Sequence, residues 1–506
     1  MPRRPPFWLT LLIILIGLPL CLPFLYVILR ATEVGLTRSV ELLFRPRMAE
    51  LLSNTMLLMV CVTIGAISLG TFCAFLLERY RFFGKAFFEV VMTLPLCIPA
   101  FVSCFTWISL TFRVEGFWGT IGIMTLSSFP LAYLPVSAIL KRLDRSLEEV
   151  SLSLGKSPVY TFWYVIFPQL KPAIGSSILL IALHMLIEFG AVSILNYQTF
   201  TTAIFQEYEM SFNNSTAALL SAVLMAICIL IVFGEIFFRG KQTLYHSGKG
   251  VTRPYLVKTL SFGKQCLTFG FFSSIFILSI GVPVIMLIYW LIVGTSLESA
   301  GDFSEFLSAF SNSFIISGLG ALLTVMCALP LVWAAVRYRS YLTIWIDRLP
   351  YLLHAVPGLV IALSLVYFSI HYANDLYQTF FVIIIAYFML YLPMAQTTLR
   401  ASLEQLSDQI EKVGQSLGRS PFYIFRTLTL PAILPGVAAA FALVFLNLMK
   451  ELTATLLLTS NDIKTLSIAV WEHTSDAQYA AATPYALMLV LFSGIPVFLL
   501  KKYAFK

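Results

Sequence analysis

Apolar runs, each long enough to cross a bilayer, recur along the whole chain and are separated by short polar stretches. A membrane-spanning helix needs about 20 mostly apolar residues. Twelve runs meet this length, at residues 7–30, 52–77, 87–111, 117–140, 172–196, 215–238, 268–294, 312–336, 350–370, 375–397, 435–458 and 482–500. The pattern therefore predicts twelve transmembrane helices, and an even number places both ends of the chain on one side.

The composition supports an all-α integral membrane protein. Apolar residues make up 59% of the 506 residues and charged residues 11%, against about 45–50% and about 25% in soluble domains. No polar stretch is long enough for a nucleotide-binding or catalytic domain. The eight cysteines stand in or beside apolar runs with no CxxC pair, which predicts buried apolar side chains rather than disulfides or metal ligands.

The positive charges predict the orientation. With the N terminus in the cytoplasm, most of the 33 Lys and Arg residues fall in cytoplasmic segments, as the positive-inside rule requires. The net charge of +8 thus reflects orientation, and nucleic acid is not expected as a partner. Arg3 and Arg4 precede the first run as in a secretory signal, but its length and the absence of a small-residue cleavage site predict a retained first helix.

The two halves of the chain repeat each other. At an offset of 258 residues, the matches are Asn54 with Asn312, Arg79-Tyr80-Arg81 with Arg337-Tyr338-Arg339, Pro99 with Pro357, and Tyr133-Leu134-Pro135 with Tyr391-Leu392-Pro393. Farther along, an offset of 263 pairs Glu148 with Glu411 and Glu188 with Glu451. We predict two six-helix units, 1–238 and 267–506, joined by a cytoplasmic linker at 239–266. Units of the same orientation are related by an axis along the membrane normal, with a central path between them.

One cytoplasmic loop occurs twice, at about residues 142–171 and 400–434. In each copy a short acidic helix ends at a glycine, Gly155 or Gly418, the usual helix terminator. The next helix opens with a serine cap and a proline: Ser157 and Pro158 in the first copy, Ser420 and Pro421 in the second. We call each helix-turn-helix a knob. The second helix of each knob is expected to expose apolar residues, namely Val159, Tyr160, Phe162 and Trp163 in one copy and Phe422, Tyr423, Ile424 and Phe425 in the other. A partner's groove would cover them.

These loops resemble the coupling loops of permeases from binding-protein-dependent ABC importers. The matching residues are Glu148 or Glu149, Gly155 and Pro168 in the first copy, and Glu411, Gly418 and Pro431 in the second. Lys412 departs from the pattern, since an acidic residue usually stands there. The resemblance implies an ATPase dimer docked on the knobs and a periplasmic or lipid-anchored substrate-binding protein outside.

ATP is not expected to bind this chain. Gly155-Lys156-Ser157 looks like the end of a phosphate-binding loop, but Val150 stands where that motif needs a glycine, and Arg419 replaces the lysine in the second copy. We therefore expect no cofactor on this chain, and ATP and Mg²⁺ on the partner ATPase.

Two acidic residues in matched apolar spans are candidates for the substrate path. Glu188 and Glu451 lie near the outer ends of their spans, and charges inside a membrane are functional candidates. Carboxylates suit a hard cation such as Fe(III), but either glutamate could instead meet a hydrogen-bond donor from another helix. His184 and His354 are not assigned to the site, because a lone histidine in a helix bundle is more often a hydrogen-bonded core residue. Pro95, Pro99, Pro350 and Pro357 are expected to kink matched helices, shaping them or freeing carbonyls toward a cavity.

The sequence thus resembles the permease subunit of an ABC importer of a bacterial inner membrane, with both termini cytoplasmic. The fused twelve-helix plan and the segments at Glu188 and at Lys450-Glu451 look most like the ferric-iron branch. Thiamine and phosphonate permeases share the plan and remain alternatives. An ion-coupled secondary transporter is the alternative from another class. No nucleophile, acid–base or metal motif points to an enzyme.

Overall fold

The computed structural model describes residues 5–143, 145–211, 213–239, 258–294, 303–338, 340–353, 356–460 and 463–504. The described chain is almost entirely helical. The one sheet among these residues is a parallel pair of two-residue strands, β1 (Tyr80–Arg81) and β2 (Lys258–Thr259). The all-α membrane fold expected from the hydrophobic pattern is confirmed.

The first half contains α1 (Phe7–Gly17), η1 (Pro19–Cys21), α2 (Leu22–Val34), α3 (Leu36–Leu43), α4 (Pro46–Arg79), α5 (Lys85–Val91), η2 (Leu94–Cys97), α6 (Ala100–Leu110), η3 (Phe112–Val114), α7 (Phe117–Ser128), α8 (Pro130–Arg142), α9 (Arg145–Ser153), α10 (Pro158–Thr161), η4 (Phe162–Ile166), α11 (Phe167–Ile187), α12 (Gly190–Ile194), α13 (Phe200–Glu209) and α14 (Asn214–Arg239). The second half contains α15 (Phe262–Phe276), η5 (Ile277–Gly281), α16 (Val282–Val293), α18 (Phe303–Arg337), α19 (Tyr341–Leu353), α20 (Gly358–Tyr372), η6 (Asn374–Leu376), α21 (Phe380–Glu404), α22 (Asp408–Ser416), α23 (Pro421–Ile424), η7 (Phe425–Thr429), α24 (Leu430–Met449), α25 (Thr453–Leu458), α26 (Leu466–Ser475) and α27 (Tyr479–Ala504).

Helices match the predicted spans. Within the described ranges, nine helices are long and apolar enough to cross a membrane, and two bent pairs bring the number to eleven. The twelfth predicted span falls on the shorter apolar stretch Tyr479–Gly494. The second half begins earlier than predicted, because α15 starts at Phe262 inside the expected linker. Of that linker, residues 240–257 lie outside the described residues.

Two of the four prolines expected to kink matched helices stand at sharp bends, whereas Pro95 lies within η2 and Pro350 lies inside the continuous helix α19. The chain bends by 94° between Lys85–Cys97 and Ala100–Leu110, at Pro99, and by 107° between Trp345–Leu353 and Gly358–Tyr372, at Pro357. Each proline stands directly before the helix that follows the bend and has no N–H to continue the preceding one. Both candidate spans are therefore broken rather than straight.

The first helices of the two halves are exchanged. One apolar core joins α1, α2 and α14 of the first half with α18, α20 and α21 of the second, while the other joins α4, α6, α7 and α8 with α15, α16 and α27. Ring contacts mark both exchanges: Trp8 lies 6.0 Å from Trp333, and Phe82 lies 5.5 Å from Phe272, between ring centroids. Each half thus covers part of the other.

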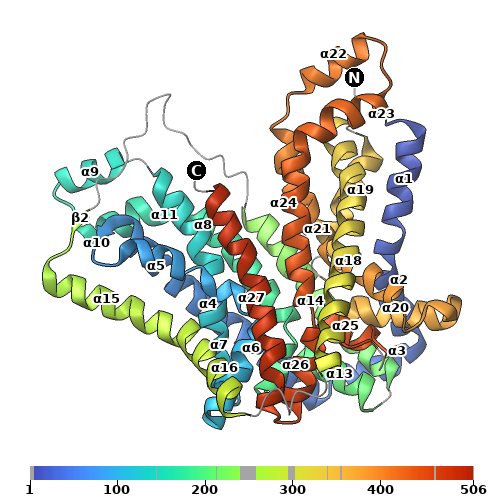
Figure 1. Ribbon diagram of the computed structural model, residues 1–506, viewed down its shortest axis with the longest axis horizontal. Helices are drawn as coiled ribbons and strands as arrows, with labels where there is room; N and C mark the ends of the chain where they lie inside the picture. Colours follow the sequence, from blue (N-terminus) through green and yellow to red (C-terminus); the bar gives the residue numbers. More distant parts are fainter. Residues whose placement is uncertain are drawn as a thin grey trace.

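The two knobs lie at one end of the molecule. Figure 1 shows α9 at the upper left and α22 at the upper right, with α13 and α26 at the opposite end. The first described helix, α1, begins at the upper end, and α27 ends there. Both ends of the described chain therefore share the side of the knobs, as an even number of spans requires.

Candidate functional site

The turn of each knob has the geometry that the sequence predicts. Gly155 and Gly418 adopt positive φ angles of +76° and +74°, which terminate α9 and α22 in the left-handed conformation. The Ser157 hydroxyl accepts a hydrogen bond from the Tyr160 N–H at 3.2 Å, and the Ser420 hydroxyl accepts one from the Tyr423 N–H at 3.3 Å. Pro158 and Pro421 occupy the first position of α10 and α23. The two knobs are therefore built alike.

The knobs expose most of the predicted apolar residues. The Val159, Tyr160, Trp163, Phe422 and Tyr423 side chains are all exposed, Val159 by 68%. Uncovered apolar side chains at a polar end of the molecule indicate a surface that a partner covers.

Three residues were wrongly predicted to be exposed. Ile424 is buried, with 2% of its surface exposed. Phe162 packs on Phe75, with ring centroids 5.0 Å apart, and Phe425 packs on Trp333 at 4.8 Å. For the two phenylalanines the reason is that one face of the second knob helix lies on a span of its own half, whereas Ile424 lies beside Gly414 of α22.

An ion pair, buried in the first half and partly buried in the second, fixes each knob to a membrane helix. Arg79 at the end of α4 pairs with Glu148, and their side chains are 2% and 8% exposed. In the second half Arg337 at the end of α18 donates from Nε to Glu411 Oε1 at 3.1 Å. Of the two acidic candidates in the first knob, Glu148 is therefore the buried match of Glu411, whereas Glu149 is exposed.

The second pair carries additional hydrogen bonds. The Thr429 hydroxyl donates to Glu411 Oε1 at 3.0 Å, and Arg337 Nη2 donates to the Leu406 carbonyl at 3.1 Å. Lys412, which departs from the family pattern, lies in α22, and its side chain is outside the described part of the structure.

Sequence reasoning missed the role of the two arginines. Their signal was present, because Arg79 and Arg337 belong to the Arg-Tyr-Arg triplets that match at offset 258. A matched arginine and a matched glutamate in each half were available to pair. The distance between them along the chain hid the contact.

Each knob continues directly into a membrane span. The prediction of separate spans from residues 172 and 435 was wrong at the inner end, because the helices run without a break over Pro158–Ile187 and Pro421–Met449. A five-residue π-helical segment joins knob to span in each half, η4 and η7. Pro168 and Pro431 stand two residues beyond these segments and have no N–H to donate, which disturbs the regular α-helical hydrogen bonding there.

Both candidate glutamates stand where a span ends rather than inside one. Helix α11 ends at Ile187 and α24 at Met449, so the predicted spans to 196 and 458 were wrong at their outer ends. Glu188 Oε1 accepts the Ala191 N–H at 3.0 Å, and Glu451 Oε1 accepts the Ala454 N–H at 3.1 Å. The two carboxylates thus cap the short helices α12 and α25, because a cap satisfies N–H groups at a helix start.

The second glutamate has a further partner from another helix. The Tyr391 hydroxyl of α21 donates to Glu451 Oε2 at 2.9 Å. His184 Nε2 lies 3.9 Å from Glu188 Oε2. The residues that the structure describes contain no group of three or more His, Cys, Asp or Glu side chains able to hold a metal ion. His354 lies outside the described residues.

The two glutamate segments lie at the junction between the halves. A Cβ added to Gly190 would come within 2.8 Å of Leu452 Cδ2 and 3.1 Å of Phe101 Cβ. Lys450 Nζ donates to the Leu96 carbonyl of the other half at 3.4 Å. This carbonyl stands beside the break at Pro99, where the sequence predicted that free carbonyls could line a cavity. In this conformation the Leu96 carbonyl instead accepts a hydrogen bond from Lys450.

Beyond the glutamates, both segments lead to an outer helix. The Glu188 carbonyl accepts the Thr201 hydroxyl at 2.8 Å, and the Glu451 carbonyl accepts the Ser467 hydroxyl at 2.7 Å. Lys464, before α26, donates to Glu305 Oε1 at 2.9 Å. That hydrogen bond raises the pKa of Lys464 above its ordinary value of 10.5. Stabilisation from this pair is therefore complete below that value and is lost only as the pH rises through the raised pKa.

Comparison with known proteins decides the family. The family model described as "Binding-protein-dependent transport system inner membrane component" matches residues 66–240 and, a second time, residues 328–503. The chain belongs to this family. The resemblance found in the two loops is confirmed, and so is the duplication of the permease unit within one chain. Members of this family are described as components of transport systems and not as enzymes.

Individual relatives are similar at several levels. The chain is 99% identical to the Fe(3+)-transport system permease protein FbpB 2 of Haemophilus influenzae over 506 residues, which is 100% of both chains. It is 24% identical to the ferric transport system permease protein FbpB of Actinobacillus pleuropneumoniae over 74% of this chain and 57% of that one. It is also 27% identical to the sulfate transport system permease protein CysT of Escherichia coli, over 45% of this chain and 91% of that one.

Proposed function

We propose that this chain forms the translocation path of an ATP-driven importer for ferric iron in a bacterial inner membrane. Both termini and both knobs then face the cytoplasm, where an ATPase dimer binds ATP and Mg²⁺ and docks on the knobs. A substrate-binding protein delivers the cargo at the opposite end, near α13 and α26. The near-identity to an Fe(3+)-transport permease supports the cargo.

The observation that carries the proposal is the matched pair of knobs, each fixed by an Arg–Glu pair. A knob that only connected two spans would have no need to expose Trp163 or Phe422. An ion-coupled transporter would not need such docking surfaces either. A helix presented to a partner's groove explains both the exposure and the rigid attachment.

The helices provide a direct mechanical link between knob and path. Pro158–Ile187 and Pro421–Met449 are continuous helices of 30 and 29 residues, so each is about 45 Å long. One end carries the docking surface and the other ends at Glu188 or Glu451. A movement of the ATPase that shifts the knobs therefore shifts the two carboxylates and the junction between the halves, which gives alternating access.

The two carboxylates support a hard cation as cargo. Oxygen ligands are the ones that Fe(III) prefers, and Glu188 and Glu451 stand at matched positions of the two halves. Each uses one oxygen to cap a helix, which leaves further lone pairs for a passing cation. The site would hold cargo only in passing, since two carboxylates provide few ligands.

Reconstituted transport tests the proposal. The chain is placed in liposomes with its candidate ATPase and binding protein, ATP is supplied on the knob side, and uptake of radiolabelled Fe(III), thiamine and sulfate is followed. The Gly155→Asp, Gly418→Asp double variant, which adds a negative charge to both knob turns, serves as the coupling-deficient control.

The result expected is uptake of iron that requires ATP and is lost in the double variant. Uptake of thiamine or sulfate in place of iron would retain the importer and reject the cargo. Transport driven by an ion gradient without the ATPase would reject the importer.

A further inference from the structure

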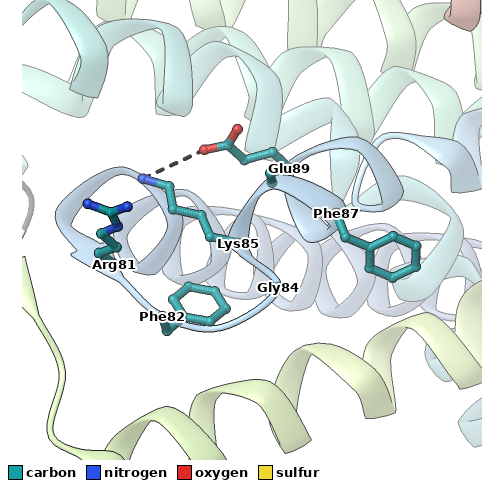
Figure 2. Close-up of a pocket in the computed structure, with 7 residues that line it drawn as sticks. Arg81, Phe82, Gly84, Lys85, Phe87 and Glu89 are labelled. Carbon is teal, nitrogen blue, oxygen red and sulfur yellow. Dashed lines mark ion pairs between the residues drawn. The ribbon is translucent and has the colours of Figure 1, made fainter.

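A small pocket lies at the turn between α4 and α5. Its volume is about 360 Å³, and it is lined by residues between 81 and 89. Figure 2 shows the side chains of Arg81, Lys85 and Glu89 along one edge of this turn, with Phe82 on the opposite side. The turn begins two residues after Arg79, the residue that holds the first knob.

The charges of the pocket are unbalanced. Lys85 Nζ lies 3.6 Å from Glu89 Oε1, in an ion pair whose side chains are 21% and 37% exposed. No carboxylate in the described part of the chain pairs with Arg81. Two cations with one partly exposed carboxylate leave the pocket with positive charge, which favours an anionic ligand.

Exposed aromatic side chains continue from the pocket along the molecule. Phe83 and Phe87 are 75% and 54% exposed. The Phe83 ring lies 5.8 Å from Phe269 of α15, and the Phe87 ring lies 5.8 Å from Phe276 of the same helix, between centroids. In an apolar membrane helix such as α15, an exposed aromatic strip faces lipid. The positive pocket therefore adjoins a surface for acyl chains.

We propose that this turn binds one anionic phospholipid, with the lipid phosphate on Arg81 and Lys85 and an acyl chain along Phe83, Phe87 and Phe269. Basic pockets beside transmembrane helices are typical sites for anionic headgroups. The adjoining aromatic strip favours a lipid over free phosphate, because free phosphate makes no use of it. The proposed lipid site does not depend on which cargo is transported. It rests on the proposed function in one respect, because the proposed orientation of the chain places the site in the cytoplasmic leaflet.

The second half lacks this site. At the matched offset Thr343 replaces Lys85. Thr343 is buried, and its hydroxyl donates to the Tyr338 carbonyl at 2.6 Å. The proposal therefore includes a stoichiometry of one bound lipid per chain.

Native mass spectrometry of the purified full-length chain tests this site. Phosphatidylglycerol, phosphatidylcholine and inorganic phosphate are titrated separately. Three double variants are compared with wild type. The first combines Arg81→Gln with Lys85→Gln, and the second, which conserves charge, combines Arg81→Lys with Lys85→Arg. The control combines Lys171→Gln with Arg426→Gln, which removes the same charge from exposed positions outside the pocket. Thermal unfolding shows whether each double variant folds.

Wild type and the charge-conserving variant are expected to bind one phosphatidylglycerol, and the double glutamine variant to bind it about tenfold more weakly. The control should bind as wild type does, and phosphatidylcholine should not compete. Equal binding by wild type and the double glutamine variant would overturn the site. Tight binding of inorganic phosphate that displaces the lipid would overturn the lipid as ligand.

Discussion

At the scale of single residues, each knob is held by one arginine, of which Arg79 is 2% and Arg337 13% exposed. Arg79 is almost fully buried, and its partner Glu148 comes from a helix 69 residues away in the chain. A buried ion pair contributes little net stability, but removal of one partner leaves an uncompensated charge. The pair therefore serves to fix the position of the knob relative to α4.

Substitution Arg79→Gln is expected to lower the free energy of unfolding by about 3–5 kcal/mol and to uncouple ATP hydrolysis from uptake. Thermal unfolding and the ratio of ATP hydrolysed to cargo taken up measure the two effects. The matched control is Lys141→Gln, which removes a partly exposed pair with Glu78 at 3.5 Å and should cost at most about 1 kcal/mol. If Glu148→Gln in the Arg79→Gln background restores stability but not coupling, the pair positions the knob.

Glu188 and Glu451 cap short helices, and a variant can separate this capping role from the proposed role in transport. Glu451→Gln keeps an oxygen that can accept the Ala454 N–H but removes the charge. We expect it to fold as wild type does and to take up iron at least about tenfold more slowly, since charge stabilisation of a cation is lost. Tyr391→Phe removes only the hydrogen bond to Oε2 and should slow uptake less. Normal uptake by the glutamine variant would leave Glu451 as a helix cap alone.

At the scale of elements, the local parts of the knob could be predicted and its attachment could not. Glycine, serine and proline at fixed spacing determine the turn, because each acts on its own backbone. The exposure of Phe162 and Phe425 was predicted wrongly because it depends on Phe75 and Trp333, which are distant in sequence. Ile424 is buried beside Gly414 of α22 in the same knob. The helix ends at Glu188 and Glu451 were missed for a similar reason, since an apolar run does not reveal where a helix breaks.

The knob turn itself makes a prediction. Among the residues that the structure describes, no atom lies within 4 Å of a Cβ added at Gly155 or Gly418, so a substitution there is limited by the positive φ alone. Asn tolerates that conformation and Val does not. We expect Gly155→Asn to keep near-normal ATP-dependent uptake and Gly155→Val to lose most of it, with each protein still assembled in the membrane. Equal uptake by the two variants would show that the turn conformation does not matter for docking.

At the scale of the whole molecule, the repeat predicts two units but not the exchange of their first helices. Tandem similarity specifies which segments correspond, whereas packing partners depend on which faces are left uncovered. The exchange places α1 and α2 on the second half and α15 and α16 on the first. Relative motion of the halves must therefore occur elsewhere, and the junction at Gly190, Leu452 and Lys450 is where the two glutamate segments meet.

One bulky substitution tests whether the halves must meet at that junction during transport. Leucine at Gly190 would clash with Leu452 and Phe101, because a single Cβ already approaches them to 2.8 and 3.1 Å. Overpacking of this kind costs about 1–3 kcal/mol, and it opposes the conformation in which the halves meet. We expect Gly190→Leu to abolish iron uptake while ATP hydrolysis continues. Gly175→Leu on α11 is the matched control, because no atom of the described part of the chain lies within 4 Å of its added Cβ. It should transport normally, and normal uptake by Gly190→Leu as well would mean that closure at this junction is not part of the transport cycle.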